Sequence, residues 1–146
     1  MGKLAGLVAV GAVLMIAACT APAEPPPQLQ IESERQGLLP KEAVTAKPTP
    51  PGPGEPGFPF PLAGWLENGQ KFAIVIGGSF GCPSFPSSIE VVDRHRMRIG
   101  VGTGGGPVCD AAWVGRTFVI RTPKQIDPTH EVTVQYGETS VRLPGL

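Results

Sequence analysis

Proline divides this chain into parts with different folding capacity. Twelve of the eighteen prolines lie between Thr20 and Pro61. Proline fixes φ and removes a backbone donor, and few apolar side chains accompany it here to offset the cost of ordering. We therefore expect residues 19–61 to form a disordered, Pro-rich linker that acts as a spacer, with a ligand for an aromatic groove of another protein as the alternative. The folded domain is expected over residues 62–146.

The first eighteen residues have the order of a secretory signal peptide. Lys3 is followed by an apolar stretch from Leu4 to Ala18, and Cys19 comes next. This order of a basic residue, an apolar run and small residues is typical of a cleaved secretory signal. The apolar run has about fifteen residues, whereas a helix that crosses a membrane needs about twenty. The sequence therefore predicts a signal peptide over residues 1–18 and not a permanent membrane span.

The end of this segment, Ile16-Ala17-Ala18-Cys19, resembles the lipobox of bacterial lipoproteins. The resemblance implies cleavage before Cys19, a lipid on its thiol, and attachment of the mature chain to the extracytoplasmic face of the cell membrane. Several acyl chains supply the multiple anchors that a stable attachment requires. The alternative is an ordinary signal peptide cut near Ala18, which leaves Cys19 as a free thiol.

The two remaining cysteines, Cys82 and Cys109, are an even number in an oxidising compartment, and we expect them to form a disulfide. Closing that loop stabilises the fold by about 3 to 4 kcal/mol in the chain-entropy account. A metal site would need more ligands at short spacing. His95 and His130 are the histidines available, and neither lies within a few residues of a cysteine. We expect no metal and no cofactor.

The sequence pattern of residues 62–146 predicts an all-β fold. Residues 62–146 carry eight Lys or Arg against seven Asp or Glu, a balance that does not indicate a nucleic-acid partner. Period-two alternation and turn signals recur every eight to twelve residues, without a helical period of useful length. The expected architecture is a small antiparallel β-sandwich or open barrel of about seven strands with one disulfide.

Three turns fix the expected strand register. They are a hairpin at Asn68-Gly69, a type II′ turn at Gly137-Glu138, and a three-residue loop at 93–95 in which His95 takes the left-handed conformation. The expected cross-strand pairs are Trp65 with Phe72, Ala63 with Ile74, Val134 with Val141, Val132 with Leu143, Val91 with Met97, Ile89 with Ile99, and Glu90 with Arg98. A further strand at 117–121 points Phe118 and Ile120 inward.

Several of these features together resemble a family. They are a strand ending in Gly77-Gly78-Ser79-Phe80-Gly81-Cys82-Pro83, a hairpin, a glycine-rich loop into Cys109-Asp110, and the strand over 116–120. The domain is similar to small actinobacterial secreted lipoproteins of uncharacterised function. The resemblance implies a disulfide-linked β domain and a high-GC Gram-positive source, and it implies no activity.

Two motifs match patterns typical of catalysis or nucleotide binding. Residues 77–81 match G-x-S-x-G, the nucleophile-elbow pattern, with Ser79 in the serine position. The elbow requires a helix directly after the serine, and Pro83 and Pro86 prevent one. Residues 100–105 match G-x-G-x-x-G, but Pro107 follows where the phosphate-binding helix should begin. We therefore expect glycine-rich turns and no catalytic residues.

Two sets of side chains form the candidate binding surface. Arg96 and Arg98 should share the outer face of one strand, where they could meet lipid phosphate or a wall polymer, or form a solvated face paired with Glu90. The expected disulfide should gather Phe80, Phe85 and Trp113 on neighbouring loops. These aromatics could recognise a partner, but shielding of the disulfide as a secondary core is the favoured interpretation.

The sequence as a whole predicts a membrane-anchored envelope lipoprotein with a small non-enzymatic β domain that binds an unknown envelope component, and not nucleic acid. One alternative is a small serine hydrolase that uses Ser79 with His95 or His130. The other alternative is a purely structural surface lipoprotein.

Overall fold

The computed structural model describes residues 25–46, 62–110 and 112–146, although the side chain of Trp113 lies outside this description. The expected signal peptide and the expected lipidation site at Cys19 also lie outside the described residues. No helix in the part that is described is long and apolar enough to cross a membrane.

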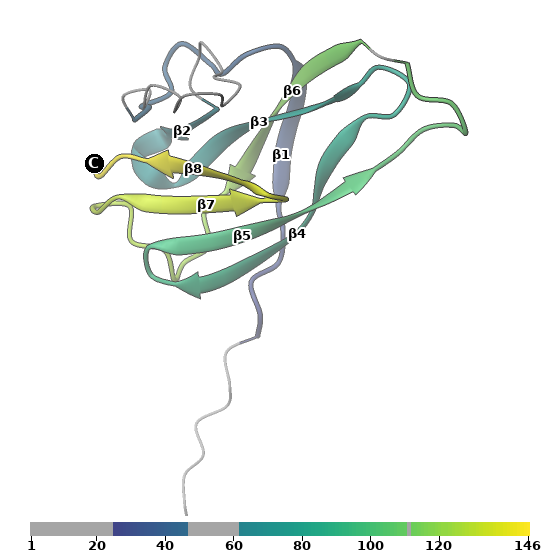
Figure 1. Ribbon diagram of the computed structural model, residues 1–146. Coiled ribbons are helices and arrows are strands. Elements are labelled where there is room, and N and C mark those ends of the chain that lie inside the picture. The colour runs from purple at the N-terminus through teal and green to yellow at the C-terminus, as the bar shows by residue number, and fades with distance from the viewer. Residues whose placement is uncertain (1–24, 47–61, 111) are drawn as a thin grey trace, which may run out of the picture.

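The fold is a small β-sandwich of two four-stranded sheets, which confirms the expected class (Figure 1). One sheet has the order β1-β6-β3-β2 and the other β4-β5-β7-β8. The described strands are β1 (Ile31–Gln36), β2 (Ala63–Leu66), β3 (Lys71–Ser79), β4 (Ser84–Asp93), β5 (Arg96–Thr103), β6 (Trp113–Arg121), β7 (Val132–Tyr136) and β8 (Thr139–Leu143), and a 3-10 turn, η1 (Glu67–Gly69), follows β2.

The connections between the sheets give the molecule two distinct ends. The chain passes from β3 to β4 and later from β5 to β6 at one end, which we call the disulfide end. The β4–β5 turn and the connection over 122–131 lie at the opposite end, which we call the histidine end. Strand β4 has ten residues, so the two ends are about 30 Å apart at about 3.3 Å per residue.

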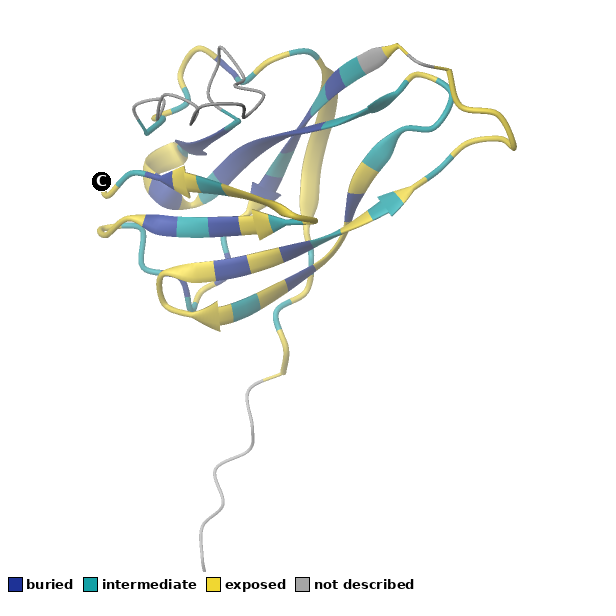
Figure 2. Cartoon of the chain, in the orientation of Figure 1, coloured by how far each residue is buried: buried dark blue, intermediate teal, exposed yellow. Residues whose placement is uncertain are grey.

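The core fills the space between the sheets. Figure 2 shows buried residues alternating with exposed or half-buried ones along β5 and β7, as expected for strands with one face on the core. The core cluster contains Ala63, Trp65, Phe72, Ile74, Ile76, Ile89, Met97, Ile99, Phe118, Ile120, Ile126, Val132, Val134 and Leu143. The inward orientation predicted for Phe118 and Ile120 is confirmed, because both are at most 1% exposed.

The strand pairs expected from the three turns are all present. Gly137 has φ of 54°, and Glu138 is not among the residues with positive φ, so this turn is of type II′ as expected. One pairing was not expected in an antiparallel fold: β5 and β7 run parallel. Antiparallel pairing otherwise holds in both sheets.

The β4–β5 turn is tighter than expected. Asp93 pairs with Arg96, and a register shift between Val91 and Asp93 takes up the extra residue. The Asp93 carboxylate accepts the His95 backbone N–H at 2.8 Å, which closes the turn without a left-handed residue. The left-handed conformation predicted for His95 is therefore wrong.

The prediction of a disordered linker is wrong for residues 31–36. They form β1, which pairs with β6 at the edge of its sheet. All six residues of β1 are exposed, so apolar burial does not hold this strand in place. Backbone pairing with β6 holds it, and Glu32 and Glu34 add ion pairs to basic residues of β3 and β6. Val44 also bridges to Trp65 on β2, so the folded unit begins well before residue 62.

Candidate functional site

The disulfide end is held together by Cys82 and Cys109, whose Cα atoms are 5.2 Å apart. The disulfide predicted from the cysteine count is confirmed. It joins the turn after β3 to the loop between β5 and β6, so the two connections at this end are linked at one place (Figure 1).

Hydrogen bonds fix the backbone of this end. The Ser79 hydroxyl accepts the Cys82 backbone N–H at 2.9 Å. The Asp110 carboxylate accepts the Phe80 N–H at 3.2 Å, from the opposite loop. Ser79 therefore closes the turn into the disulfide, as a serine in a local side-chain turn does.

The glycines of the 100–105 stretch serve close packing. Gly105 has φ of 109°, and a Cβ there would collide with the Gly81 backbone. A Cβ at Gly102 would come within 2.8 Å of the Phe85 ring, so this glycine leaves room for the aromatic. These roles account for two glycines of the G-x-G-x-x-G match without a nucleotide.

Large apolar side chains are exposed at the disulfide end. Phe80 is 65% exposed and Val108, on the facing loop, is 80% exposed. Phe85 is 39% exposed and rests partly on β5. The favoured interpretation of these aromatics as a shield for the disulfide is therefore wrong for Phe80. Trp113 begins β6 at the same end. Val108 could not be predicted as part of this surface, because a single valine in a glycine-rich loop carries no pattern.

The arginine face lies on β5. Arg96 donates to Asp93 at 2.7 Å and Arg98 donates to Glu90 at 2.9 Å. The hydrogen bond from the His95 backbone, followed by that from Arg96, holds the pKa of Asp93 below its ordinary value. Both arginines point to solvent as expected, and each is already paired with a carboxylate. This arrangement fits a solvated face better than a free anion-binding surface.

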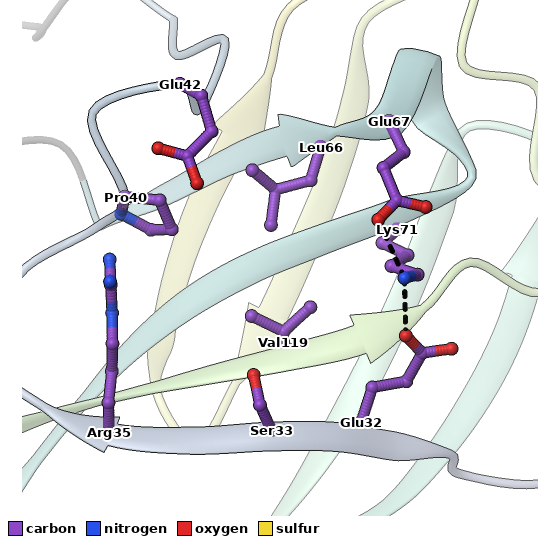
Figure 3. A pocket seen from close by; sticks show the side chains of 9 residues that line it. All are labelled: Glu32, Ser33, Arg35, Pro40, Glu42, Leu66, Glu67, Lys71 and Val119. Carbon is purple, nitrogen blue, oxygen red and sulfur yellow. Dashed lines mark hydrogen bonds and ion pairs between the residues drawn. The ribbon is translucent and has the colours of Figure 1, made fainter.

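A groove of about 480 Å³ lies between β1, the residues after it and the β2–β3 turn (Figure 3). Lys71 points into one end of the groove and donates to Glu32 at 2.6 Å and to Glu67 at 2.7 Å. Arg121 also donates to Glu32 at 2.6 Å. These ion pairs neutralise one another, so this end of the groove attaches β1 to the sheet and leaves little net charge for a ligand.

The ion pairs shift the pKa values of Glu32 and Lys71 in the groove. The hydrogen bond from Lys71, followed by that from Arg121, lowers the pKa of Glu32 below its ordinary value. The hydrogen bond to Glu32 raises the pKa of Lys71 in turn. Both groups therefore stay charged at neutral pH.

The histidine end brings together residues that lie far apart in the sequence. The ring centroids of His95 and His130 are 5.1 Å apart, and Asp127 lies beside them. The Asp127 carboxylate accepts the hydroxyl of Thr129 at 2.6 Å and its backbone N–H at 3.1 Å. These bonds lower the pKa of Asp127, the hydroxyl contributing most. This cluster could not be predicted from local patterns, because 34 residues separate the two histidines in the chain.

The structure separates the serine of the G-x-S-x-G match from both histidines. Ser79 is at the disulfide end, and His95 and His130 are at the histidine end, about 30 Å away along β4. Nucleophilic catalysis needs the serine and its base within hydrogen-bond reach. The fold does not bring this pair together.

Comparison of the chain with protein-family models, with curated proteins and with solved structures finds no match.

Proposed function

We propose that this chain is a lipid-anchored envelope lipoprotein whose β-sandwich is a non-enzymatic binding module, with its binding surface at the disulfide end. The observation that carries the proposal is the exposure of Phe80 and Val108 on two loops that the Cys82–Cys109 disulfide joins. Neighbouring exposed apolar side chains mark interaction sites more often than single ones do.

The rigidity of the disulfide end supports this role. The disulfide and the hydrogen bonds of Ser79 and Asp110 hold both loops before any partner arrives. A surface that is already ordered loses less conformational entropy on binding. The large buried aromatics Trp65, Phe72 and Phe118 lie in the main core, so the fold does not need Phe80 as a core residue.

The course of the chain also supports a binding surface that faces away from the membrane. Ile31 pairs with Ile120, near the end of β6 that lies at the histidine end. A lipid on Cys19 would leave twelve residues up to Ile31, a reach of at most about 40 Å. The anchor would then approach the sandwich at the histidine end, and the disulfide end would project about 30 Å farther from the membrane.

A photocrosslinking amino acid at position 80, introduced in the intact cell envelope, tests the binding surface. We expect one discrete adduct from position 80 that is lost in the Val108→Ser variant. The matched control is the same crosslinker at Val92, which is 46% exposed on β4 and away from the disulfide end. Equal adducts from positions 80 and 92, or an adduct that survives Val108→Ser, would contradict a binding surface at the disulfide end.

Membrane attachment is tested separately by metabolic labelling with a fatty-acid analogue. We expect the label and membrane sedimentation in the wild-type chain, and loss of both in Cys19→Ala. Attachment that persists in Cys19→Ala would overturn the proposed lipid anchor and leave the binding surface as a separate question.

A further inference from the structure

The β4–β5 turn and the connection over 122–131 are fastened to one another by backbone hydrogen bonds. The Asp127 N–H donates to the carbonyl of Arg94 at 2.9 Å. The Thr133 N–H donates to the carbonyl of His95 at 2.8 Å. These bonds hold the backbone on both sides of the cluster formed by His95, Asp127 and His130. The three side chains therefore project from a fixed frame although the histidines are exposed.

The ligand atoms of the cluster are close to the separation that one metal ion requires. One imidazole nitrogen from each histidine and one Asp127 oxygen all lie within 4.8 Å of one another. Ligands at about 2.0 to 2.2 Å from a tetrahedral ion are about 3.4 Å apart. Small side-chain rotations close this difference, since both histidines are exposed and the His130 Nδ1 already lies 3.3 Å from the Asp127 Oδ2 and 3.0 Å from the Thr129 hydroxyl. Thr129 already orients the Asp127 carboxylate through two hydrogen bonds.

We propose that His95, Asp127 and His130 bind one divalent transition-metal ion, with Zn²⁺ as its representative and water in the remaining coordination position. Two imidazoles and one carboxylate suit zinc and its neighbours, whereas Ca²⁺ and Mg²⁺ favour sites made of oxygen ligands. A bound ion would link the β4–β5 turn directly to the connection that leads into β7. Binding to the folded state alone would therefore stabilise the sandwich.

Arg94 provides the strongest internal test, because its charge opposes a cation. Its guanidinium lies 3.3 Å from the Asp127 Oδ2 and would have to withdraw when an ion binds. The Arg94 side chain is 76% exposed, so it can turn toward solvent. Removing this charge should strengthen metal binding, while removal of an arginine elsewhere on the same hairpin should not.

The test is calorimetric titration of ZnCl₂ into the full chain with its disulfide intact, without a histidine tag, and with Cys19→Ser so that no free thiol competes. We expect one zinc per chain with a micromolar or tighter dissociation constant, and no binding of MgCl₂ in the same range. His95→Ala and His130→Ala should each weaken binding at least tenfold. Arg94→Gln should tighten it several-fold. The matched control Arg98→Gln, whose partner is Glu90, should leave the affinity unchanged.

Several results would overturn the site. They are binding only at millimolar zinc, binding that survives His130→Ala unaltered, and an Arg94→Gln affinity no different from that of Arg98→Gln. Two-dimensional NMR gives a second readout, because one equivalent of zinc should shift signals of residues 93–96 and 127–131 first. Shifts centred on the disulfide end instead would place the ion elsewhere and refute the cluster as its site.

Discussion

Thr117 shows how one polar side chain attaches the segment after β1 to the sheet. It has no exposed surface, and its hydroxyl donates to the Gly37 carbonyl at 2.7 Å. A buried hydroxyl without a partner is unfavourable, so this bond both satisfies Thr117 and fixes Gly37 over β6.

We expect Thr117→Val to lower the free energy of unfolding by about 1 to 2 kcal/mol, because the shape is kept and the Gly37 carbonyl loses its donor. Urea denaturation followed by tryptophan fluorescence measures the change. The matched control Thr139→Val alters an exposed threonine on β8 and should shift stability by less than about 0.5 kcal/mol. Equal losses in the two variants would mean that the Gly37 bond contributes nothing.

Some residue contacts could be predicted from the sequence, and the reasons are local. The Glu90–Arg98 ion pair follows from the hairpin register, since facing residues on one side of a strand pair must meet. The contact between His95 and His130 could not be predicted, because it depends on where a long connection packs against a turn. The exposure of Phe80 could not be predicted either, since a glycine-rich turn does not indicate where a side chain points.

At the scale of elements, the hairpins were predictable and β1 was not. Asn68-Gly69 and Gly137-Glu138 carry turn chemistry that sets the register of the flanking strands. β1 lacks an apolar face and is held by backbone pairing and ion pairs, which composition does not reveal. The parallel pairing of β5 with β7 joins strands that precede and follow β6 in the sequence, so no local turn encodes it.

The attachment of β1 should depend on pH through Glu32. Lys71 and Arg121 lower the pKa of Glu32 in the folded state, so the unfolded chain takes up the proton first as pH falls. The stability that Glu32 contributes is therefore present above its unfolded pKa and lost as pH falls through its folded pKa. We expect Glu32→Gln to lower the urea midpoint at neutral pH and to converge with wild type in acid.

The urea midpoint of both proteins, measured from about pH 7 to about pH 2, checks this prediction. Lys71→Met removes the largest cause of the pKa shift and should flatten the pH dependence in the same direction. A constant difference between wild type and Glu32→Gln over the whole range would show that the carboxylate charge does not contribute to holding β1.

At the scale of the molecule, the two ends of the sandwich carry different kinds of residues. The disulfide end presents exposed apolar side chains on a backbone fixed by Cys82–Cys109. The histidine end presents a polar cluster fixed by hydrogen bonds between two connections. Trp65 on β2 links its sheet to the residue that follows β8 near the C-terminus, since its indole N–H donates to the Pro144 carbonyl at 2.6 Å. The length of β4 places these features at opposite ends, whereas the strand order within each sheet follows from packing that no turn signal specifies.

The disulfide should contribute to the stability of the whole fold, whereas the aromatic next to it should not. Cys82 and Cys109 are 27 residues apart, and closing such a loop restricts the unfolded chain by about 3 to 4 kcal/mol in the chain-entropy account. We expect the Cys82→Ala/Cys109→Ala variant to lose about this much free energy of unfolding, measured by urea denaturation. Phe80→Ser should stay within about 0.5 kcal/mol of wild type, because an exposed side chain has little burial to lose. A loss in Phe80→Ser as large as that of the cysteine variant would make Phe80 a core residue and remove the basis for binding at this end.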